Sequence, residues 1–235
     1  MQMSETEELE QAVDRILRST SSKKLIVAGP GAGKTFLFKR VLERTPGESK
    51  SRLVLTFINE LKDDLERSLS DLASVYTLHG YCHYLLRRNP VLSVGLTDDF
   101  DYFPSIPTLI KRDWEIANGK QAPQFVGLMR DLQTGAETDF YLARSNYYDA
   151  IGYDDSVFRV HARLSEDPDQ ISQYDLVLID EFQDFNRLES SFINLLASES
   201  PILIVGDDDQ AGQERLIRSD DYFAKATASD GSRRL

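Results

Sequence analysis

Cysteine and long apolar runs are nearly absent from this chain of 235 residues. The single cysteine, Cys82, has no second cysteine with which to form an internal disulfide or a cysteine metal cluster, and this fits a reducing compartment. No apolar stretch approaches the roughly 20 residues that a membrane-spanning helix needs. The acidic start, MQMSETEELE, also differs from a secretory signal peptide. We therefore expect a cytoplasmic protein with no membrane-spanning segment.

Basic residues are also in deficit. The chain has 27 Lys and Arg against 39 Asp and Glu, which gives a net charge of −12. This balance argues against a protein that coats nucleic acid by bulk attraction, although it is compatible with a local basic track on an acidic body. With 41% hydrophobic and 28% charged residues, the composition is that of a globular protein that is long enough to bury a core.

The most informative stretch is LIVAGPGAGKT, at residues 25–35. Its apolar start predicts a strand, its glycines predict a loop, and Lys34 and Thr35 open a helix. Backbone N–H groups, a helix dipole and a lysine then converge on one point, which is a phosphate cradle. The residues expected to bind nucleotide are Ala28, Gly29, Pro30, Gly31, Ala32, Gly33, Lys34 and Thr35. The Thr35 hydroxyl is expected on Mg²⁺, and Ala28 replaces the first glycine of the usual G-x-x-x-x-G-K-[ST] pattern.

Two further apolar runs end in acidic motifs. Phosphoryl transfer needs a held nucleotide, a held cation and a water aimed at the γ-phosphate. In DEFQD, we expect Asp180 to hold Mg²⁺ through water beside Thr35, and Glu181 to orient and deprotonate the attacking water. The alternative for DEFQD is an acidic helix start that complements the helix dipole. In GDDDQ, Gln210 is placed to sense the γ-phosphate by hydrogen bonding.

Apolar runs and segments of helical periodicity alternate along much of the chain. Strands are expected at residues 25–28, 53–57, 74–77, 175–180 and 201–205. Helices are expected at residues 5–19, 35–45, 59–72, 78–88 and 187–197, with Asn59 as a cap. This alternation implies a parallel α/β sheet with helices on both faces, and such sheets bind ligands at the carboxyl ends of their strands.

The alternation stops between about Pro90 and Tyr174. Helices are expected there at residues 108–118, 123–132 and 155–164, so this part is interpreted as an inserted, mainly helical subdomain. Its aromatic residues are more typical of core than of base-stacking platforms: Phe100, Tyr102, Phe103, Tyr147, Tyr148 and Tyr153. The predicted organisation is therefore a first part of the sheet domain, the insertion, a second part and a polar tail, at residues 1–89, 90–174, 175–210 and 211–235. For the tail, a helix over residues 214–225 and a disordered end are the alternatives.

Five segments carry a resemblance to a known family when they are taken in order. GPGAGKT, LTFINELKDDLE, YTLHGYCHYLLRR, LVLIDEFQD and ILIVGDDDQ resemble the N-terminal half of the UvrD/Rep-type superfamily 1 DNA helicases. The resemblance covers residues 25–88 and 174–210, and the intervening part matches in its position, where those enzymes insert a helical subdomain. It implies a RecA-like P-loop NTPase fold, ATP and Mg²⁺ as cofactors, and ATP hydrolysis coupled to translocation on single-stranded DNA.

The resemblance also implies residue roles. Lys34 and Thr35 bind phosphate and Mg²⁺, Asp180 and Glu181 coordinate Mg²⁺ and activate water, and Gln210 links nucleotide state to strand movement. The residues expected to touch single-stranded DNA are Thr56, Phe57, Asn59, Thr77 and His79. Without the family, His79 is typical of a hydrogen-bonded structural histidine.

The sequence departs from the family's pattern in three respects. The adenine-reading glutamine has no convincing match, since Gln11 lacks the flanking pattern, and Phe36 stands where arginine is frequent. After GDDDQ the chain runs AGQERLIRSDDYF instead of continuing into a second RecA-like domain with arginine fingers, which are worth roughly 10³ to 10⁵ in rate.

We therefore expect the ATP-binding domain of a UvrD-like helicase, truncated here or completed by a separate chain that supplies the second domain. On its own, this chain is expected to bind Mg·ATP and to hydrolyse it slowly. The alternatives are a stand-alone nucleotide-dependent binding or regulatory module without unwinding activity, and a P-loop ATPase that acts on something other than DNA.

Overall fold

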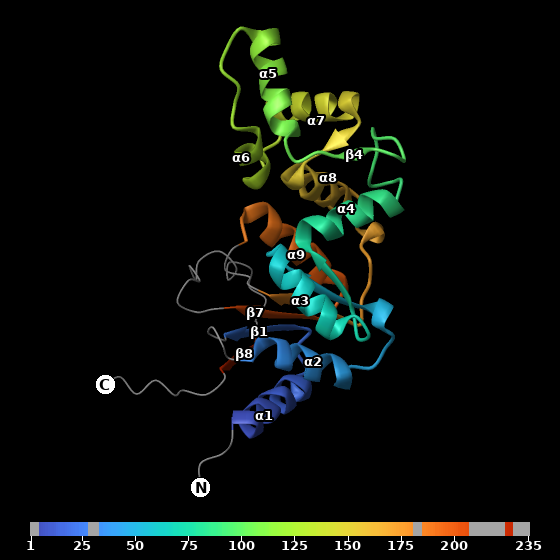
Figure 1. Ribbon diagram of the computed structural model, residues 1–235, viewed down its shortest axis with the longest axis vertical. Coiled ribbons are helices and arrows are strands. Elements are labelled where there is room, and N and C mark those ends of the chain that lie inside the picture. Colours follow the sequence, from blue (N-terminus) through green and yellow to red (C-terminus); the bar gives the residue numbers. More distant parts are fainter. Residues whose placement is uncertain (1–4, 28–32, 181–184, 207–223, 228–235) are drawn as a thin grey trace, which may run out of the picture. The chain divides into compact units, whose positions relative to one another are not determined.

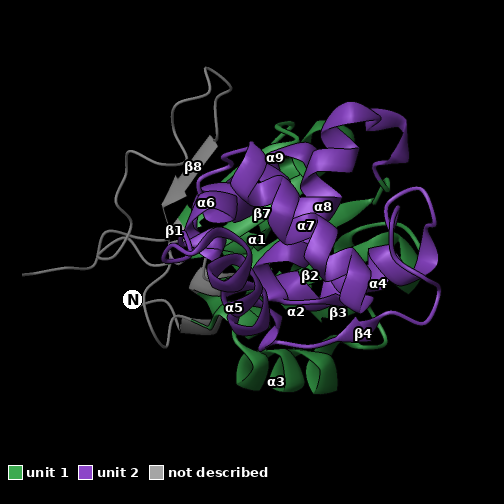
Figure 2. Ribbon diagram, turned by 90° about the horizontal axis from the view of Figure 1, so that it is seen from above, with its two compact units in different colours: residues 1–77, 172–184, 196–235 green, residues 78–171, 185–195 purple. Residues whose placement is uncertain are grey.

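The computed structural model describes residues 5–27, 33–180, 185–206 and 224–227 (Figure 1). The chain divides into two compact units, which Figure 2 colours separately. Unit 1 comprises Met1–Thr77, Ser172–Asp184 and Leu196–Leu235, and unit 2 comprises Leu78–Ile171 and Phe185–Leu195. Each unit is described by itself below.

A six-stranded sheet in the order β3-β2-β6-β7-β1-β8 forms the centre of unit 1. Every neighbouring pair of strands in it is parallel. The strands are β1 (Lys23–Val27), β2 (Arg52–Thr56), β3 (Ser74–Thr77), β6 (Leu176–Asp180), β7 (Ile202–Gly206) and β8 (Ala224–Thr227). The first five lie where apolar runs predicted strands, with small shifts at their ends. The prediction of a parallel sheet is therefore confirmed.

Burial explains why these strands are so apolar. All five residues of β2, of β6 and of β7 are buried, although successive side chains of a strand point to opposite faces. Both faces of the sheet are therefore covered, as is usual when helical connections join parallel strands. The predicted α/β fold with flanking helices is confirmed.

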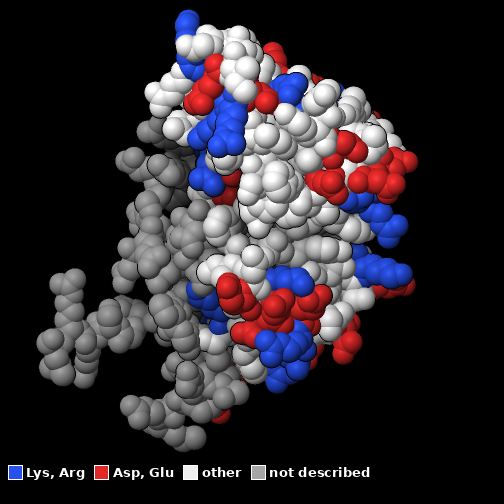
Figure 3. All heavy atoms as spheres, turned by 45° about the horizontal axis from the view of Figure 1, so that its top comes forward, with Lys and Arg blue, Asp and Glu red and all other residues white. Residues whose placement is uncertain are grey.

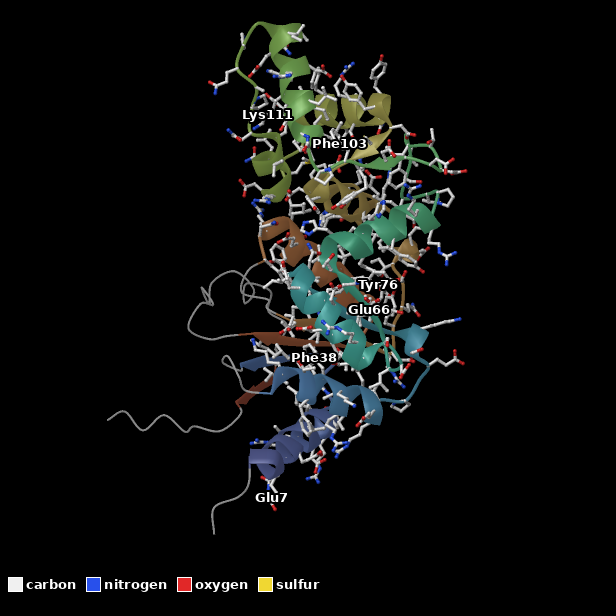
Figure 4. The ribbon with its side chains drawn as sticks, in the orientation of Figure 1. Glu7, Phe38, Glu66, Tyr76, Phe103 and Lys111 are labelled. Carbon is white, nitrogen blue, oxygen red and sulfur yellow. The ribbon has the colours of Figure 1, made fainter. Side chains whose placement is uncertain are left out.

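Three helices of unit 1 pack their apolar stripes into one core with the sheet. They are α1 (Glu5–Arg18), α2 (Lys34–Arg44) and α3 (Asn59–Leu69), and a short 3₁₀ turn, η1 (Ser49–Ser51), precedes β2. Their buried contributions to this core are Val13, Ile16, Leu37, Phe38, Val41, Leu42, Leu65 and Leu69. Phe38 is fully buried and is labelled in Figure 4. Within each helix these residues recur at helical spacing and therefore lie on one face.

The expected cap of α3 is one residue out of place. Ile58, with an extended backbone (φ −103°, ψ 129°), occupies the cap position, and its side chain makes no capping hydrogen bond. Asn59 is the first helical residue and is exposed. Isoleucine has no side-chain acceptor, so the sequence pattern pointed to the neighbouring asparagine instead.

Unit 2 is mainly helical, as predicted for the insertion. Its helices are α4 (Leu78–Arg88), α5 (Ile106–Asn118), α6 (Phe125–Arg130), α7 (Ala136–Tyr148), α8 (Tyr153–Glu166) and η2 (Pro168–Gln170). α9 (Arg187–Glu199) begins in unit 2 and ends in unit 1. A short parallel pair, β4 (Asp101–Tyr102) and β5 (Ala150–Ile151), completes the unit. The sequence patterns did not predict α7, β4 or β5.

The aromatic residues of the insertion do not all lie in its core. Phe100 is 1% exposed, as expected for core. The same expectation is wrong for Phe103, Tyr153 and Tyr147, which are 45%, 45% and 73% exposed. Tyr147 lies in the last turn of α7, on the side of that helix that faces solvent.

Unit boundaries and the tail also differ from the sequence-based division. In the structure, residues 78–89 and 185–195 belong to the helical unit, whereas the sequence-based division assigned them to the sheet domain. The four residues of β8 pair in parallel with β1 at the edge of the sheet, where a polar tail without a strand was expected. AKAT is too short and too mixed to produce an alternating pattern, so its pairing depends on the edge that β1 offers. The remainder of the tail lies outside the described residues.

Among the residues that the structure describes, no helix is both long enough and apolar enough to cross a bilayer.

Candidate functional site

The candidate site is built at the carboxyl edge of the unit 1 sheet. Thr77, the last residue of β3, pairs with Thr56, the last residue of β2. Leu55 pairs with Ile179, which brings Thr56 level with Asp180 at the end of β6. Three residues that the sequence analysis assigned to DNA contact or to Mg²⁺ therefore follow one another along one edge, on adjacent strands.

β7 separates the two strands that precede the expected nucleotide motifs. It lies between β1 and β6, with Gly206 opposite Val27 and with Val205 opposite Asp180. Because neighbouring strands are about 4.8 Å apart, β1 and β6 end about 10 Å from each other. Val27 and Asp180, the last residues of β1 and β6, therefore lie on the same edge of the sheet with one strand between them.

The amino end of α2 has the properties of an anion site. Gly33 precedes the helix with φ 73° and ψ 30°, a left-handed conformation that glycine adopts without the steric cost of a Cβ. Within the described residues, no side chain caps this end, and the first turn contains no acidic residue. The amino end of α2 therefore has the backbone N–H groups and the first turn without negative charge that are typical of an anion-binding helix end. Lys34 is half-buried and Thr35 is exposed in the same turn.

Asp180 is placed where a cation-binding carboxylate is needed. It is the last residue of β6 and is only 3% exposed. A buried carboxylate is costly unless hydrogen bonds or a positive charge compensate it. No group of three or more His, Cys, Asp or Glu in the described part of the chain could hold a metal ion. Mg²⁺ does not need such a cage, because it keeps several waters and binds through one or two protein oxygens and substrate phosphates.

Several predicted site residues lie outside the described residues. They are Ala28, Gly29, Pro30, Gly31, Ala32, Glu181 and Gln210. The described part of the phosphate loop therefore consists of Gly33, Lys34 and Thr35, and Asp180 is the described part of the acidic motif.

Thr56 stands out among the expected DNA-contact residues of unit 1. Its side chain is fully buried, and its hydroxyl group has no hydrogen-bond partner among the residues that the structure describes. An unsatisfied buried hydroxyl costs about 1–3 kcal/mol and in native proteins usually has a reason, such as a water or ligand that completes it. Phe57, next in the chain, is half-buried, and Asn59 is exposed. Thr56 therefore has unused hydrogen-bonding capacity at the edge where ligands are expected.

His79, in unit 2, has a defined polar environment. It lies in the first turn of α4, and its Nε2 is 3.5 Å from Oε1 of Glu189, which is in the first turn of α9. The imidazole also contacts the ring of Tyr153 edge-on, at 5.6 Å between centroids. Burial lowers the pKa of His79, and the nearby Asp154 carboxylate partly opposes this effect.

Sequence reasoning missed Glu189, which is almost completely buried. Burial raises the pKa of Glu189 to about 7, against the hydrogen bond that it accepts from the backbone of Asn186. Close by, Arg130 donates to both carboxylate oxygens of Asp154, at 2.6 and 3.3 Å. One local signal was available, because N-x-x-E after an acidic turn is the pattern of a capping box. Arg130 and Asp154 have no comparable signal.

Charge is mixed on the surface. Figure 3 shows Lys and Arg next to Asp and Glu on the face that it presents. On α3, Lys62 pairs with Glu66 at 2.6 Å, and Arg67 pairs with Asp64 at 2.5 Å (Glu66 is labelled in Figure 4). Such pairs neutralise the basic side chains of α3, so this helix presents no unbroken positive patch.

Comparison with known proteins agrees with this geometry. Residues 10–214 match the family described as AAA domain, which is well over half of the chain. The chain belongs to this family. Its P-loop NTPase fold, expected from LIVAGPGAGKT and DEFQD, is thereby confirmed.

Curated relatives point to a narrower group. The chain is 27% identical over 232 residues to DNA helicase II of Haemophilus influenzae, covering 80% of this chain and 32% of that protein. It is 26% identical over 238 residues to ATP-dependent DNA helicase PcrA of Staphylococcus aureus, covering 83% and 32%. DNA helicase II of Salmonella typhimurium gives 26% over 231 residues, covering 81% and 32%. The chain thus spans about a third of the length of these relatives. The resemblance to UvrD/Rep-type helicases that the motifs indicated is confirmed, whereas the roles of individual residues remain predictions.

Proposed function

We propose that this chain is the ATP-binding part of a UvrD/Rep-type DNA helicase. Its carboxyl-edge site binds Mg·ATP, and the adjacent strand ends and α4 contact single-stranded DNA. The observation that carries the proposal is the alignment of Thr77, Thr56 and Asp180 along one edge, with the uncapped end of α2 two strands beyond. Nucleotide and DNA contacts on neighbouring strands are the arrangement that a DNA-dependent ATPase needs.

At the nucleotide, the N–H groups of α2 and the Lys34 ammonium bind phosphate oxygens, since both supply positive charge. Bound Mg²⁺ supplies neutralisation of the phosphate charge, and Thr35 and Asp180 are the residues proposed to hold it. Glu181 orients the attacking water and takes its proton, and Gln210 reports the presence of the γ-phosphate.

At the DNA, Thr56, Phe57, Asn59, Thr77 and His79 are the proposed contacts. Hydroxyl, amide and imidazole groups donate to phosphate oxygens, and Phe57 offers a ring on which a base stacks. These groups are few and largely uncharged, which agrees with the acidic composition of the chain.

Nucleotide binding is tested by calorimetry with Mg·ATP on the whole chain and on Lys34→Ala. A hydrogen bond to a charged group is worth about 1.5–3 kcal/mol, so Lys34→Ala should weaken binding by about 10- to 100-fold. Lys39→Ala is the matched control. Lys39 is exposed on the same helix, and its replacement by alanine removes the same charge. Absence of binding by the unaltered chain, or equal weakening by both variants, refutes the proposal for this site.

Turnover and DNA dependence separate the motor from a simple binding module. We propose that rapid hydrolysis requires a second RecA-like domain, and that the protein works in the cytoplasm. ATPase activity measured with and without single-stranded DNA, for this chain alone, should be slow in both conditions. Nucleotide binding without any affinity for DNA would favour a regulatory nucleotide-binding module instead.

A further inference from the structure

A cluster of polar groups lies at the first turns of three helices in unit 2. His79 is in the first turn of α4, Asp154 in that of α8 and Glu189 in that of α9. Arg130, in the last turn of α6, forms a two-point ion pair with Asp154. Asp154 is 8% exposed and Glu189 is 1% exposed. The two carboxylates of the cluster are thus buried within the unit, whereas the Arg130 side chain is about half exposed.

Both carboxylate oxygens of Glu189 are engaged, in different directions. Oε2 accepts a hydrogen bond of 2.8 Å from the backbone N–H of Asn186, while the backbone N–H of Glu189 donates to Oδ1 of Asn186 at 3.1 Å. This reciprocal pair is a capping box that sets where α9 begins. Oε1 faces Nε2 of His79 at 3.5 Å. One side chain therefore ties the start of α9 to the start of α4.

A cap alone does not require this second contact. Capping needs one carboxylate oxygen on the backbone, and it is usually achieved at a solvent-exposed helix end. Here the capping carboxylate is buried, where desolvation is costly and is only partly offset by the dipoles of the helix ends and by Arg130. Burial of this group next to His79 thus points to a role beyond ending a helix.

The position of the two helices in the chain makes the contact useful. α4 begins at Leu78, the residue directly after Thr77. α9 begins at Arg187, a few residues after Asp180 at the end of β6. The contact between the two first turns therefore connects two segments of the chain. One segment follows Asp180, the proposed Mg²⁺ ligand, and the other follows Thr77, a proposed DNA contact.

We propose that Glu189 is a positioning residue that couples the two ligand sites: through Asn186 and His79 it makes the DNA-contact segment respond to nucleotide bound at Asp180. The proposal rests on the proposed function, because it requires that the chain bind both ligands. Glu189 itself touches neither ligand. Its effect is on how strongly binding of one ligand changes the affinity for the other.

The measured quantity is the ratio of the dissociation constants for single-stranded DNA without and with nucleotide. Fluorescence anisotropy of a labelled oligothymidylate gives both constants on the whole chain, and Mg²⁺ with a non-hydrolysable ATP analogue is the nucleotide. Coupled sites typically change each other's affinity by at least about fivefold, in either direction. The unaltered chain should show such a change.

Four variants separate coupling from capping. Glu189→Met keeps the volume of the buried side chain and loses both contacts, and Glu189→Ala is a second variant that loses them. In both variants the ratio should be about 1, which means that nucleotide no longer changes the affinity for DNA. Glu189→Gln retains an oxygen for Asn186 and an amide donor for His79, so its ratio should stay within about twofold of the unaltered chain. Asn186→Ala removes half of the capping box and leaves the His79 contact, so it should keep the ratio despite a less stable helix.

Circular dichroism establishes that each variant is folded before its ratio is taken. The inference is overturned by an unchanged ratio in both Glu189→Met and Glu189→Ala, by a ratio near 1 in the unaltered chain, or by an equal loss of coupling in Asn186→Ala. If the unaltered chain binds no nucleotide, the proposed function fails together with the inference. If it binds both ligands and only the ratio is insensitive to Glu189, the inference alone fails.

Discussion

Titration of Glu189 provides a sharp test of the buried cluster in unit 2. Burial raises the pKa of this carboxyl from 4.5 to about 7 in the folded chain. The groups that face it are His79, Arg130, Asp154 and the backbone of Asn186. Because the folded state holds the proton more tightly than the unfolded state, protonation favours folding. The stabilising contribution is therefore complete below about pH 4.5 and is lost as the pH rises through about 7.

The expected size follows from the same two values. A pKa difference of this size corresponds to about 3 kcal/mol in the free energy of unfolding. Glu189→Gln cannot ionise, so subtracting its free energy of unfolding from that of the unaltered chain isolates this one group. Titrating residues that do not face Glu189, such as Asp155, whose pKa burial raises to about 6, contribute nearly equally to both proteins and cancel.

Urea unfolding between pH 5 and pH 8 measures the difference, and the only tryptophan is a suitable reporter. Trp114 lies in α5 of unit 2, with its ring edge-on to Phe125 and Phe140 at 5.7 and 5.0 Å. Its fluorescence therefore follows unfolding of the unit that contains Glu189. The unaltered chain should lose about 2.5 kcal/mol relative to Glu189→Gln across this range, because the loss begins just below pH 5. A difference that stays constant with pH refutes the assignment of a buried, readily protonated carboxyl to Glu189.

Two further substitutions test unit 1, one at the proposed nucleotide site and one in the core. Gly33→Ala places a Cβ on a residue with φ 73°, so it should cost about 1–2 kcal/mol in urea unfolding and weaken Mg·ATP binding. Gly127→Ala is its control, since the added Cβ meets only ordinary contact at 3.6 Å within α6, and it should be neutral or stabilising. Equal losses in the two would contradict the argument. Phe38→Ala removes a fully buried ring and should cost about 3–5 kcal/mol in thermal or urea unfolding. Phe36→Ala, half-buried on the same helix, should cost clearly less, and the reverse order would disprove the assigned core face of α2.

Much of the fold was predictable because its strands and helices carry their signals within short stretches of sequence. β2, β6 and β7 are continuous apolar runs, and α1, α2 and α3 repeat their apolar residues at helical spacing. Such signals depend on near neighbours in the chain, and tertiary packing did not override them here. They fail where the segment is short or where its pairing is distant, as in β4, β5 and β8.

The sequence by itself predicted a phosphate-binding loop between a strand and a helix, and further strands that end in DEFQD and GDDDQ. Only the tertiary structure decided that β7 separates β1 from β6, and that Thr77, Thr56 and Asp180 follow one another along one edge. Strand order depends on contacts between segments far apart in the chain, which no window of residues records. The contact between His79 and Glu189 is of the same kind, because it joins two helix starts that are far apart in the sequence.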